Sequence, residues 1–329
     1  MTRVPRIVVT DYTFPDLDPE SALVQQAGFE LVGHQCETLD DLIGAVADAD
    51  AVITQFARIT PAVIAAMTRA RAIVRYGIGV DNVDLDAAQA HAIPVSNIPD
   101  YCIDEVADHT LSFILGLTRQ VVTHTREMQA GRWGMAVPVH EMRVLREQTV
   151  GVLGFGRIGR EVVRRLLAFK CHVLVHDPLA AAADIVALGA VAASLEQVVA
   201  AADVLTLHCP STPDTRNLVG SALLGRMKTG ALLVNLSRGD LVVTDALVAA
   251  LRSGQLAGAA LDVFDSEPLP AVHPLRTLPN VIIAPHIASV SPTARHALRE
   301  GAARRAIAAV RGELPANVVN GVTVPRSVG

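Results

Sequence analysis

Short apolar runs alternate with amphipathic stretches over the first hundred residues of the chain. The run RIVVTD is typical of a short buried strand that ends in a turn, and PESALVQQAGFELVG predicts a helix followed by a strand. DDLIGAVADADAVIT repeats this alternation, ARAIVRYGIGVDNVD adds a strand and a glycine-containing loop, and AIPVSNIP predicts one more strand. These residues are therefore expected to form a small α/β unit of their own.

The middle of the chain combines a clear helical pattern with a segment that has none. Residues 104–122 predict a helix, and Asp104 and Glu105 in its first turn complement the helix dipole. Residues 123–148 are irregular and contain Trp133, the only tryptophan. A long irregular connection inside a compact domain is usually functional, so this segment predicts an interaction arm.

After residue 148, apolar runs separated by helical stretches predict a doubly wound parallel sheet, because parallel strands that are buried on both faces read as continuous apolar runs. The runs are VGVLGFG, CHVLVHD, AADVLTLHCP, ALLVNLSRG, AGAALDVF and VIIAPHI. Residues 292–312 predict an amphipathic C-terminal helix whose arginines lie together on a solvated face.

Length and composition narrow the class of protein. A chain of 329 residues is long enough for two domains, and 51% hydrophobic residues with only 3% aromatic residues suit alternating strands and helices. The net charge of −5 comes with no basic block, so nucleic acid is not an expected ligand. No apolar run reaches the length of a signal sequence or a membrane span, which predicts a soluble cytoplasmic protein without a membrane partner.

The four cysteines are far apart and show no CxxC spacing. Free thiols in a reducing compartment are therefore expected, and a structural zinc ion or another metal is not. These cysteines are Cys36, Cys102, Cys171 and Cys209.

The most informative motif is VGVLGFGRIG at residues 150–159, in which an apolar run leads into glycines and then into a helical pattern. In a dinucleotide fold, Gly154 allows the tight turn, Gly156 lets the backbone approach a pyrophosphate, and Gly159 lets the helix pack on the strand. Asp177 ends the next strand, about twenty residues further on, where a carboxylate would accept hydrogen bonds from a ribose diol and repel a 2′-phosphate. The motif therefore predicts NAD rather than NADP, with an ordinary glycine turn or an S-adenosylmethionine site as the alternatives.

Polar side chains also follow the later predicted strands, and ligands of doubly wound folds bind at these strand ends. An arginine can fork onto a substrate carboxylate and polarise the neighbouring carbonyl, a histidine can transfer the hydroxyl proton, and a carboxylate can hold the imidazole. Such a set suits reduction of a 2-oxo acid. Each residue alone has a plainer explanation as a surface, capping or turn residue, but their coincidence beside a dinucleotide motif favours a catalytic site. The residues are His208, Pro210, Thr215, Arg238, Asp262, Glu267 and His286.

At these motifs the chain resembles the D-isomer-specific 2-hydroxyacid dehydrogenases. GFGRIG with VHDP is similar to the family's cofactor motif, and LLVNLSRGDLVV, ALDVFDSEP and APHIAS are similar to its three catalytic blocks. The resemblance implies that Arg238, Glu267 and His286 are catalytic and that the loop YGIGVDNVD binds the substrate carboxylate through the backbone N–H groups of Ile78 and Gly79. It further implies the following cofactor contacts: Asp262 at the nicotinamide carboxamide, His208 and Pro210 along the cofactor, Thr215 near the phosphates, and Arg157 and Ile158 over the pyrophosphate.

The same resemblance implies two Rossmann-like domains with a cleft between them. Residues 1–101 and 292–329 would form a flavodoxin-like substrate domain, and residues 102–291 an NAD-binding domain with a dimerisation arm near residues 121–148. The expected protein is a homodimer that acts on a small 2-oxo or 2-hydroxy acid.

The closest branch by resemblance includes the C-terminal binding proteins and bacterial enzymes similar to phosphoglycerate dehydrogenase. Two positions depart from its members. Thr54 and Phe56 stand where phosphoglycerate enzymes have arginines, so Phe56 is expected at an unphosphorylated substrate, and Ser289 stands where the C-terminal binding proteins have a tryptophan. An NAD-dependent dehydrogenase is the leading interpretation, and an NAD-sensing scaffold is the alternative.

Overall fold

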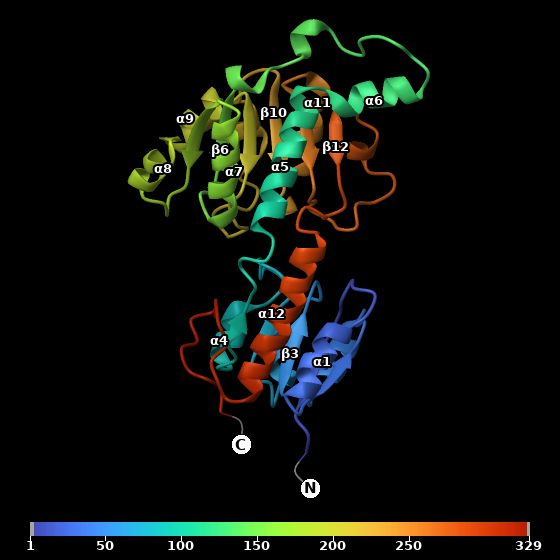
Figure 1. Ribbon diagram of the computed structural model, residues 1–329, viewed down its shortest axis with the longest axis vertical. Coiled ribbons are helices and arrows are strands. Elements are labelled where there is room, and N and C mark those ends of the chain that lie inside the picture. Colours follow the sequence, from blue (N-terminus) through green and yellow to red (C-terminus); the bar gives the residue numbers. More distant parts are fainter. Residues whose placement is uncertain (1–2, 328–329) are drawn as a thin grey trace. The chain divides into compact units, whose positions relative to one another are not determined.

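The computed structural model describes residues 3–327, and within it the chain divides into two compact units (Figure 1). The first unit consists of Met1–Tyr101 and Ser291–Gly329, and the second of Cys102–Val290. Each unit has one parallel sheet with helices on both faces, so the prediction of two doubly wound α/β units is confirmed.

The sheet of the first unit has five strands in the order β2-β1-β3-β4-β5, which is the flavodoxin-like order. Its strands are β1 (Arg6–Val9), β2 (Glu30–Gly33), β3 (Ala51–Thr54), β4 (Ile73–Arg75) and β5 (Val95–Ser96). Its helices are α1 (Asp18–Gln26), α2 (Leu39–Val46), α3 (Pro61–Ala66), α4 (Leu85–Ala90) and α12 (Pro292–Val310).

Successive residues of these short strands point to opposite faces, and both faces are buried, which explains the continuous apolar runs. Ile7 and Ile53 pack under α1 and α12, whereas Val8 and Val52 pack under α2, α3 and α4. The chain after α12 returns to the sheet, where the side chain of Asn320 accepts a hydrogen bond from the backbone of Val95. The C-terminal segment thus covers the edge strand β5.

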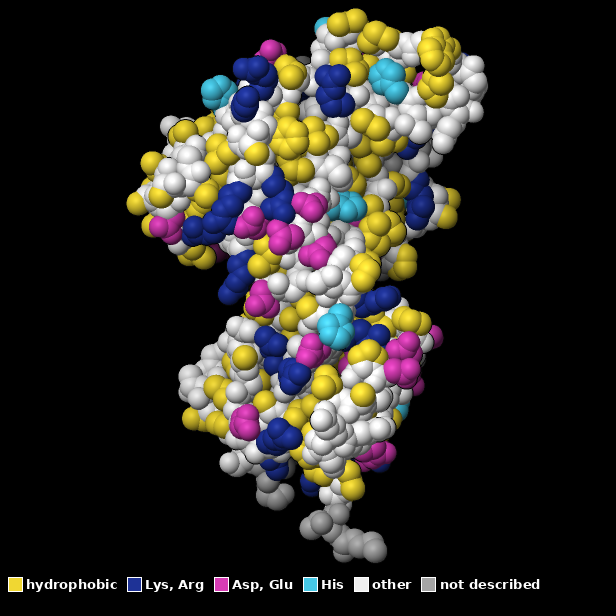
Figure 2. All heavy atoms as spheres, viewed as in Figure 1, with side chains coloured by type: hydrophobic (Ala, Val, Ile, Leu, Met, Phe, Trp, Pro, Cys, Tyr) yellow, Lys and Arg dark blue, Asp and Glu magenta, His cyan; other side chains and the backbone are white. Residues whose placement is uncertain are grey.

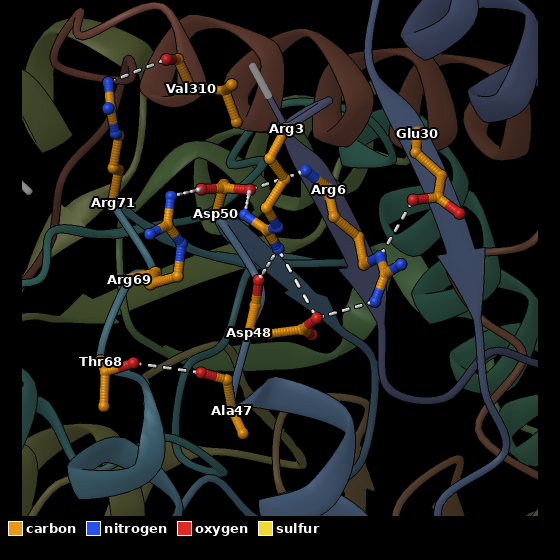
Figure 3. Close-up of polar contacts among 10 residues, drawn as sticks. All are labelled: Arg3, Arg6, Glu30, Ala47, Asp48, Asp50, Thr68, Arg69, Arg71 and Val310. Atoms are coloured by element: carbon orange, nitrogen blue, oxygen red, sulfur yellow. Dashed lines mark hydrogen bonds and ion pairs between the residues drawn. The ribbon is translucent and has the colours of Figure 1, made fainter. Parts of the chain in front are cut away.

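Charged side chains tie together the amino ends of β1, β2 and β3 (Figure 3). Asp50, which is buried, accepts hydrogen bonds from the backbone N–H of Arg6 at 2.8 Å and from the Arg3 guanidinium at 2.7 Å. The Arg6 guanidinium reaches Glu30 at 3.0 Å and Asp48 at 2.8 Å. Because ligands of such folds bind at the carboxyl ends of the strands, we regard this cluster as structural.

The sheet of the second unit has seven parallel strands in the order β12-β11-β10-β9-β6-β7-β8. Its strands are β6 (Thr149–Leu153), β7 (His172–His176), β8 (Val191–Ala192), β9 (Val204–Leu207), β10 (Ala231–Asn235), β11 (Leu256–Leu261) and β12 (Val281–Ile283). Its helices are α5 (Ile103–Thr118), α6 (Val121–Gln129), α7 (Arg157–Ala168), α8 (Ala182–Leu188), α9 (Leu195–Ala201), α10 (Ser221–Leu224) and α11 (Thr244–Ser253). Short 3₁₀ turns lie at Val139–Glu141, Leu145–Glu147, Gly239–Leu241 and Pro274–Arg276.

The strand order of this sheet reverses between β6 and β9, which makes the carboxyl ends of these two strands the expected ligand position. Helices α5 and α7 pack against each other, and α5 also packs against β10, β11 and β12. Among the residues that the structure describes, none of the helices has both the length and the apolar character that crossing a membrane requires.

Two predictions about helices were wrong. The helix expected to run to Val122 ends at Thr118, because Gln120 adopts a left-handed conformation with φ of 53° and a second helix, α6, follows. The part of the arm up to Gln129 is therefore helical. No residue of α6 is buried, so no core imposes an apolar period on its sequence.

The expectation that all arginines of the C-terminal helix are solvated was also wrong. Arg299 of α12 is 5% exposed, and its guanidinium binds the carboxylates of Glu20 and Asp16. A buried arginine with paired carboxylates looks the same in the sequence as an exposed one, because the partner residues lie 279 and 283 positions away.

Candidate active site

The glycine turn lies where β6 ends and α7 begins. Gly154 has φ of +102°, and a Cβ there would lie 2.5 Å from the carbonyl carbon of His208. A Cβ at Gly159 would lie 2.2 Å from the carbonyl oxygen of Gly154. Neither position can hold a side chain, because neighbouring backbone atoms lie too close. At Gly154 the positive φ is a second reason.

Gly156 has a different environment. A Cβ built at this position meets nothing within 4 Å, and no side chain caps the first turn of α7, which starts at Arg157 and Ile158. No capping side chain therefore occupies the N–H groups at the start of α7. This arrangement fits a pyrophosphate, which the N–H groups of a helix start would bind.

Asp177 follows β7 and is held beside this turn. Its carboxylate accepts hydrogen bonds from the backbone N–H groups of Phe155 at 2.6 Å and Leu179 at 2.8 Å, one on each oxygen. Each carboxylate oxygen has a further lone pair, so Asp177 can still accept hydrogen bonds from ribose hydroxyls. The hydrogen bond from Phe155, which lies within the glycine turn, therefore holds Asp177 beside that turn.

His208, at the end of β9, lies against the same turn. Its backbone N–H donates to Leu153 at 2.7 Å, and its Nε2 is 3.0 Å from the hydroxyl of Thr206. Burial lowers the pKa of His208 to about 4, so its ring is neutral at pH 7 and adds no charge beside the cofactor motif. Further along this loop, the Thr215 hydroxyl donates to the carbonyl of Pro210 at 2.6 Å and thereby braces the loop.

The three predicted catalytic side chains follow β10, β11 and β12, which are neighbours in the sheet. Nδ1 of His286 lies 2.7 Å from Oε2 of Glu267, and the other oxygen of Glu267 accepts a hydrogen bond from Phe264. The loop that carries Arg238 packs on the Glu267 loop so closely that a Cβ at Gly239 would lie 1.8 Å from the carbonyl carbon of Phe264. The structure therefore joins the imidazole and the carboxylate and brings the arginine loop against them.

The electrostatics of this group favour an ionised Glu267. Partial burial of its carboxyl opposes ionisation, but the hydrogen bond and charge of His286 and the nearby charge of Arg238 outweigh it and lower the pKa of Glu267. The contact with the carboxylate through Nδ1 fixes the orientation of the His286 ring, and an imidazole is a group that can exchange a proton with a substrate.

Asp262, which ends β11, shapes the histidine loop. Its carboxylate is 1% exposed and accepts hydrogen bonds from the backbone N–H groups of Ile287 at 2.9 Å and Ala288 at 2.8 Å. Burial of the carboxyl raises the pKa of Asp262, although these two N–H groups oppose the effect. His286 adopts a left-handed φ of 54°, an uncommon conformation for a histidine, and the bonds to Asp262 hold the loop that contains it. This positioning role escaped sequence reasoning, and the expected contact to the carboxamide remains a prediction.

The remaining predicted residues lie in the first unit, in the loops that follow β3 and β4. The carbonyl of Gly77 accepts a hydrogen bond from Ile98, and the carbonyl of Ile78 accepts one from the Asn97 side chain at 2.6 Å, which fixes the loop that contains Gly79. In the neighbouring loop, the Phe56 side chain is 48% exposed.

Three residues of this region escaped the sequence prediction: Asp11, Arg75 and Asn97. The Asp11 carboxylate accepts hydrogen bonds from the backbone N–H groups of Gln55, Phe56 and Ala57. The guanidinium carbon of Arg75 lies 5.9 Å from the centre of the Phe56 ring. Each of these polar residues follows an apolar run directly or within a few positions, which is the signal that could have found them.

Within the part of the chain that the structure describes, no group of three or more His, Cys, Asp or Glu side chains is placed to hold a metal ion.

Known proteins resemble this chain in sequence and in fold. Residues 111–288 match the family model of the D-isomer-specific 2-hydroxyacid dehydrogenase NAD-binding domain. A glyoxylate reductase of Korarchaeum cryptofilum is 37% identical over 284 residues, which cover 85% of each chain. A D-3-phosphoglycerate dehydrogenase of Mycobacterium leprae is 36% identical over 85% of this chain, which spans only 52% of that enzyme. The crystal structure of an Aquifex aeolicus D-lactate dehydrogenase with NAD and lactic acid covers 96% of this chain and 100% of its own, with a TM-score of 0.88 at 27% identity.

Proposed function

Since the chain belongs to the D-isomer-specific 2-hydroxyacid dehydrogenase family, we propose that it interconverts a small 2-oxo acid and the corresponding D-2-hydroxy acid with NAD as its cofactor. The observation that carries this proposal is the contact of 2.7 Å between His286 and Glu267 at neighbouring strand ends. The same sheet carries the Arg238 loop and the glycine turn.

In this proposal each residue of the site has a defined role. Reduced nicotinamide, when bound, supplies the hydride for reduction of the substrate carbonyl carbon. Arg238 binds the substrate carboxylate and polarises the carbonyl, and the N–H groups of Ile78 and Gly79 bind the same carboxylate. His286 donates the proton to the carbonyl oxygen through Nε2, and Glu267 stabilises the imidazolium form before that transfer.

The proposed substrate is an unphosphorylated 2-oxo acid of the size of glyoxylate or pyruvate. Phe56 carries no charge of its own, but the Arg75 guanidinium lies 5.9 Å from its ring centre, so the support for an unphosphorylated acid is the naming of the relatives. The glyoxylate reductase and lactate dehydrogenase relatives are named for acids of this size.

A steady-state screen tests the proposal. Purified protein with NADH is expected to reduce glyoxylate, hydroxypyruvate or pyruvate with a higher kcat/KM than the 2-oxo form of 3-phosphoglycerate. Tight NADH binding with no turnover of any 2-oxo acid would instead support the alternative of an NAD-sensing scaffold.

NADH is expected to be preferred over NADPH by at least about tenfold in kcat/KM, which corresponds to about 1.4 kcal/mol. The reason is that the Asp177 carboxylate, held by Phe155 and Leu179, would face the 2′-phosphate of NADPH. Asp177→Asn removes the charge, keeps one acceptor oxygen and should narrow the preference. Asp86→Asn, at an exposed position of α4 in the first unit, makes the same change away from the motif and should leave the ratio unaltered. Equal use of both cofactors by the unaltered protein would contradict the role of Asp177.

We also propose a homodimer, held by α5 and by the arm of residues 121–148. Figure 2 shows hydrophobic side chains gathered over α6 and the loop that follows it. Trp133 is 90% exposed, and a patch of such large apolar side chains is unusual on the surface of a monomer. The other exposed apolar residues of the arm are Val121, Met128, Met135, Val139 and Val144.

Light scattering at micromolar concentration is expected to give the mass of two chains. Trp133→Asp should weaken the dimer, whereas Val272→Asp, at a site that is 94% exposed outside the arm, should not. A fully active monomer at that concentration would contradict the proposal.

A cytoplasmic location is also part of the proposal. Its support is that the four cysteines are all free thiols in the structure, a state that a reducing compartment maintains.

A further inference from the structure

The first unit contains a buried ion pair that the reaction does not use. Glu20 of α1 is fully buried, and Arg299 of α12 is 5% exposed. The guanidinium grips the carboxylate with two nitrogens, Nε at 2.8 Å from Oε1 and Nη2 at 2.7 Å from Oε2. Burying two charges is costly even when they are paired, and apolar side chains would join two helices without that cost. The pair therefore calls for an explanation other than helix packing.

A tyrosine completes the group. The Tyr76 hydroxyl donates a hydrogen bond to Oε1 of Glu20 at 2.9 Å, and the side chain is 1% exposed. Burial and the Glu20 charge raise the pKa of Tyr76 well above its ordinary value, so the hydroxyl keeps its proton and remains a donor. The Phe14 ring packs edge-on against Tyr76, with ring centres 5.3 Å apart, and the Arg299 guanidinium lies 4.8 Å from the centre of the Phe14 ring.

Tyr76 connects this group to the substrate loop. It stands directly before Gly77, Ile78 and Gly79, and its backbone N–H donates to the carbonyl of Thr54 at 2.8 Å. Beyond Tyr76, the loop is held by Ile98 and Asn97 through the carbonyls of Gly77 and Ile78. The side chain of Tyr76 thus holds the loop on the side of α1 and α12. Its hydroxyl is held by Glu20, and Glu20 is held by Arg299.

We propose that Tyr76, Glu20 and Arg299 are positioning residues for the substrate loop, which set the direction of the N–H groups of Ile78 and Gly79 and thereby the affinity for the substrate carboxylate. Three fixed groups explain why charge is buried at this place: the Arg299 fork orients the carboxylate, and the carboxylate orients the phenol. The proposal rests on the proposed function in so far as the loop binds a carboxylate.

Tyr76→Phe tests the proposal because it keeps the packed ring and removes only the hydroxyl. KM for the 2-oxo acid is expected to rise about five- to tenfold, the effect of losing one hydrogen bond, with kcat changed by less than about twofold. The Kd of NADH should stay the same. Hydrogen exchange at the backbone of residues 77–79 should become faster. Tyr12→Phe, in the same unit, is the matched control and should change none of these quantities.

A second pair of variants checks the role of the ion pair. Arg299→Met should reproduce the rise in KM and the faster exchange. Arg299→Lys keeps the charge but not the planar guanidinium, so KM and the exchange rate should lie between those of Arg299→Met and the wild type. If Tyr76→Phe lowers the melting temperature but leaves both KM and loop exchange at the wild-type values, the network is structural only and the proposal is wrong. If the wild type reduces no 2-oxo acid, the proposed function is wrong, and the exchange rates alone then decide whether Tyr76 positions the loop.

Discussion

His286→Asn is expected to lower kcat by roughly 10²–10⁴, the range of one acid–base group, with the Kd of NADH largely unchanged. Asparagine can keep a hydrogen bond to Glu267, but its amide cannot gain and release a proton near neutral pH. In the structure the imidazole touches Glu267 through Nδ1, so proton transfer to the substrate depends on Nε2. The loss should therefore appear in the chemical step and not in binding.

Single-turnover kinetics on the best 2-oxo acid, together with a fluorescence titration of NADH, would measure the two effects separately. His296→Asn is the matched control, because His296 is exposed on α12 and also pairs with a glutamate, Glu300 at 3.4 Å. That variant should keep wild-type kcat. Turnover of His286→Asn within a few-fold of the wild type would mean that another group transfers the proton and that the assignment of this site is wrong.

The pH dependence follows from the Glu267 partner. Because the pKa of Glu267 is lowered, its carboxylate stays ionised at pH values below the ordinary glutamate range and presents a negative charge to the imidazole, so reduction should be faster on the acid side and oxidation on the alkaline side. Glu267→Gln removes the counter-charge. In the pH profile for reduction of the 2-oxo acid, the fall in rate should shift to lower pH. The activity that Glu267→Gln loses relative to the wild type should be smallest at low pH.

Most of the fold was predictable because both sheets are buried on both faces. Strands such as β6 and β10 therefore appear as continuous apolar runs, and helices such as α7 and α9 separate them. The arm was predicted only as an irregular segment, since α6 has no buried face and Gln120 reverses the backbone without a glycine. An exposed helix leaves no apolar period in the sequence.

The site was predictable to the extent that function requires a residue at a strand end. Arg238, Glu267 and His286 follow three strands, and the rule for doubly wound sheets places such residues at one edge. The supporting contacts were not predictable, because they join residues far apart in the chain. Glu20 and Arg299 appear in the sequence as ordinary charges of amphipathic helices, and only the structure shows them as a buried pair.

Arg238→Lys is expected to raise KM and lower kcat together, with kcat/KM reduced by about 10²–10³, the loss of one or two charge-assisted hydrogen bonds. Lysine keeps the positive charge but not the planar fork, and one guanidinium is proposed to bind the carboxylate while it polarises the carbonyl. The loop holds Arg238 firmly: the Asn235 side chain donates to its carbonyl at 2.8 Å, and one nitrogen of its guanidinium donates to the carbonyl of Ser237 at 2.7 Å.

A shorter, unbranched lysine ammonium cannot keep the contact to Ser237 and also reach both substrate groups, so ground-state binding and the transition state should both suffer. The Kd of NADH should change little, because the glycine turn and Asp177 lie on other loops of the sheet. Arg304→Lys, at an exposed position of α12, makes the same chemical change and should leave both constants as they are. If Arg238→Lys raises KM and leaves kcat at the wild-type value, Arg238 binds the carboxylate only, and the polarisation of the carbonyl must come from His286 alone.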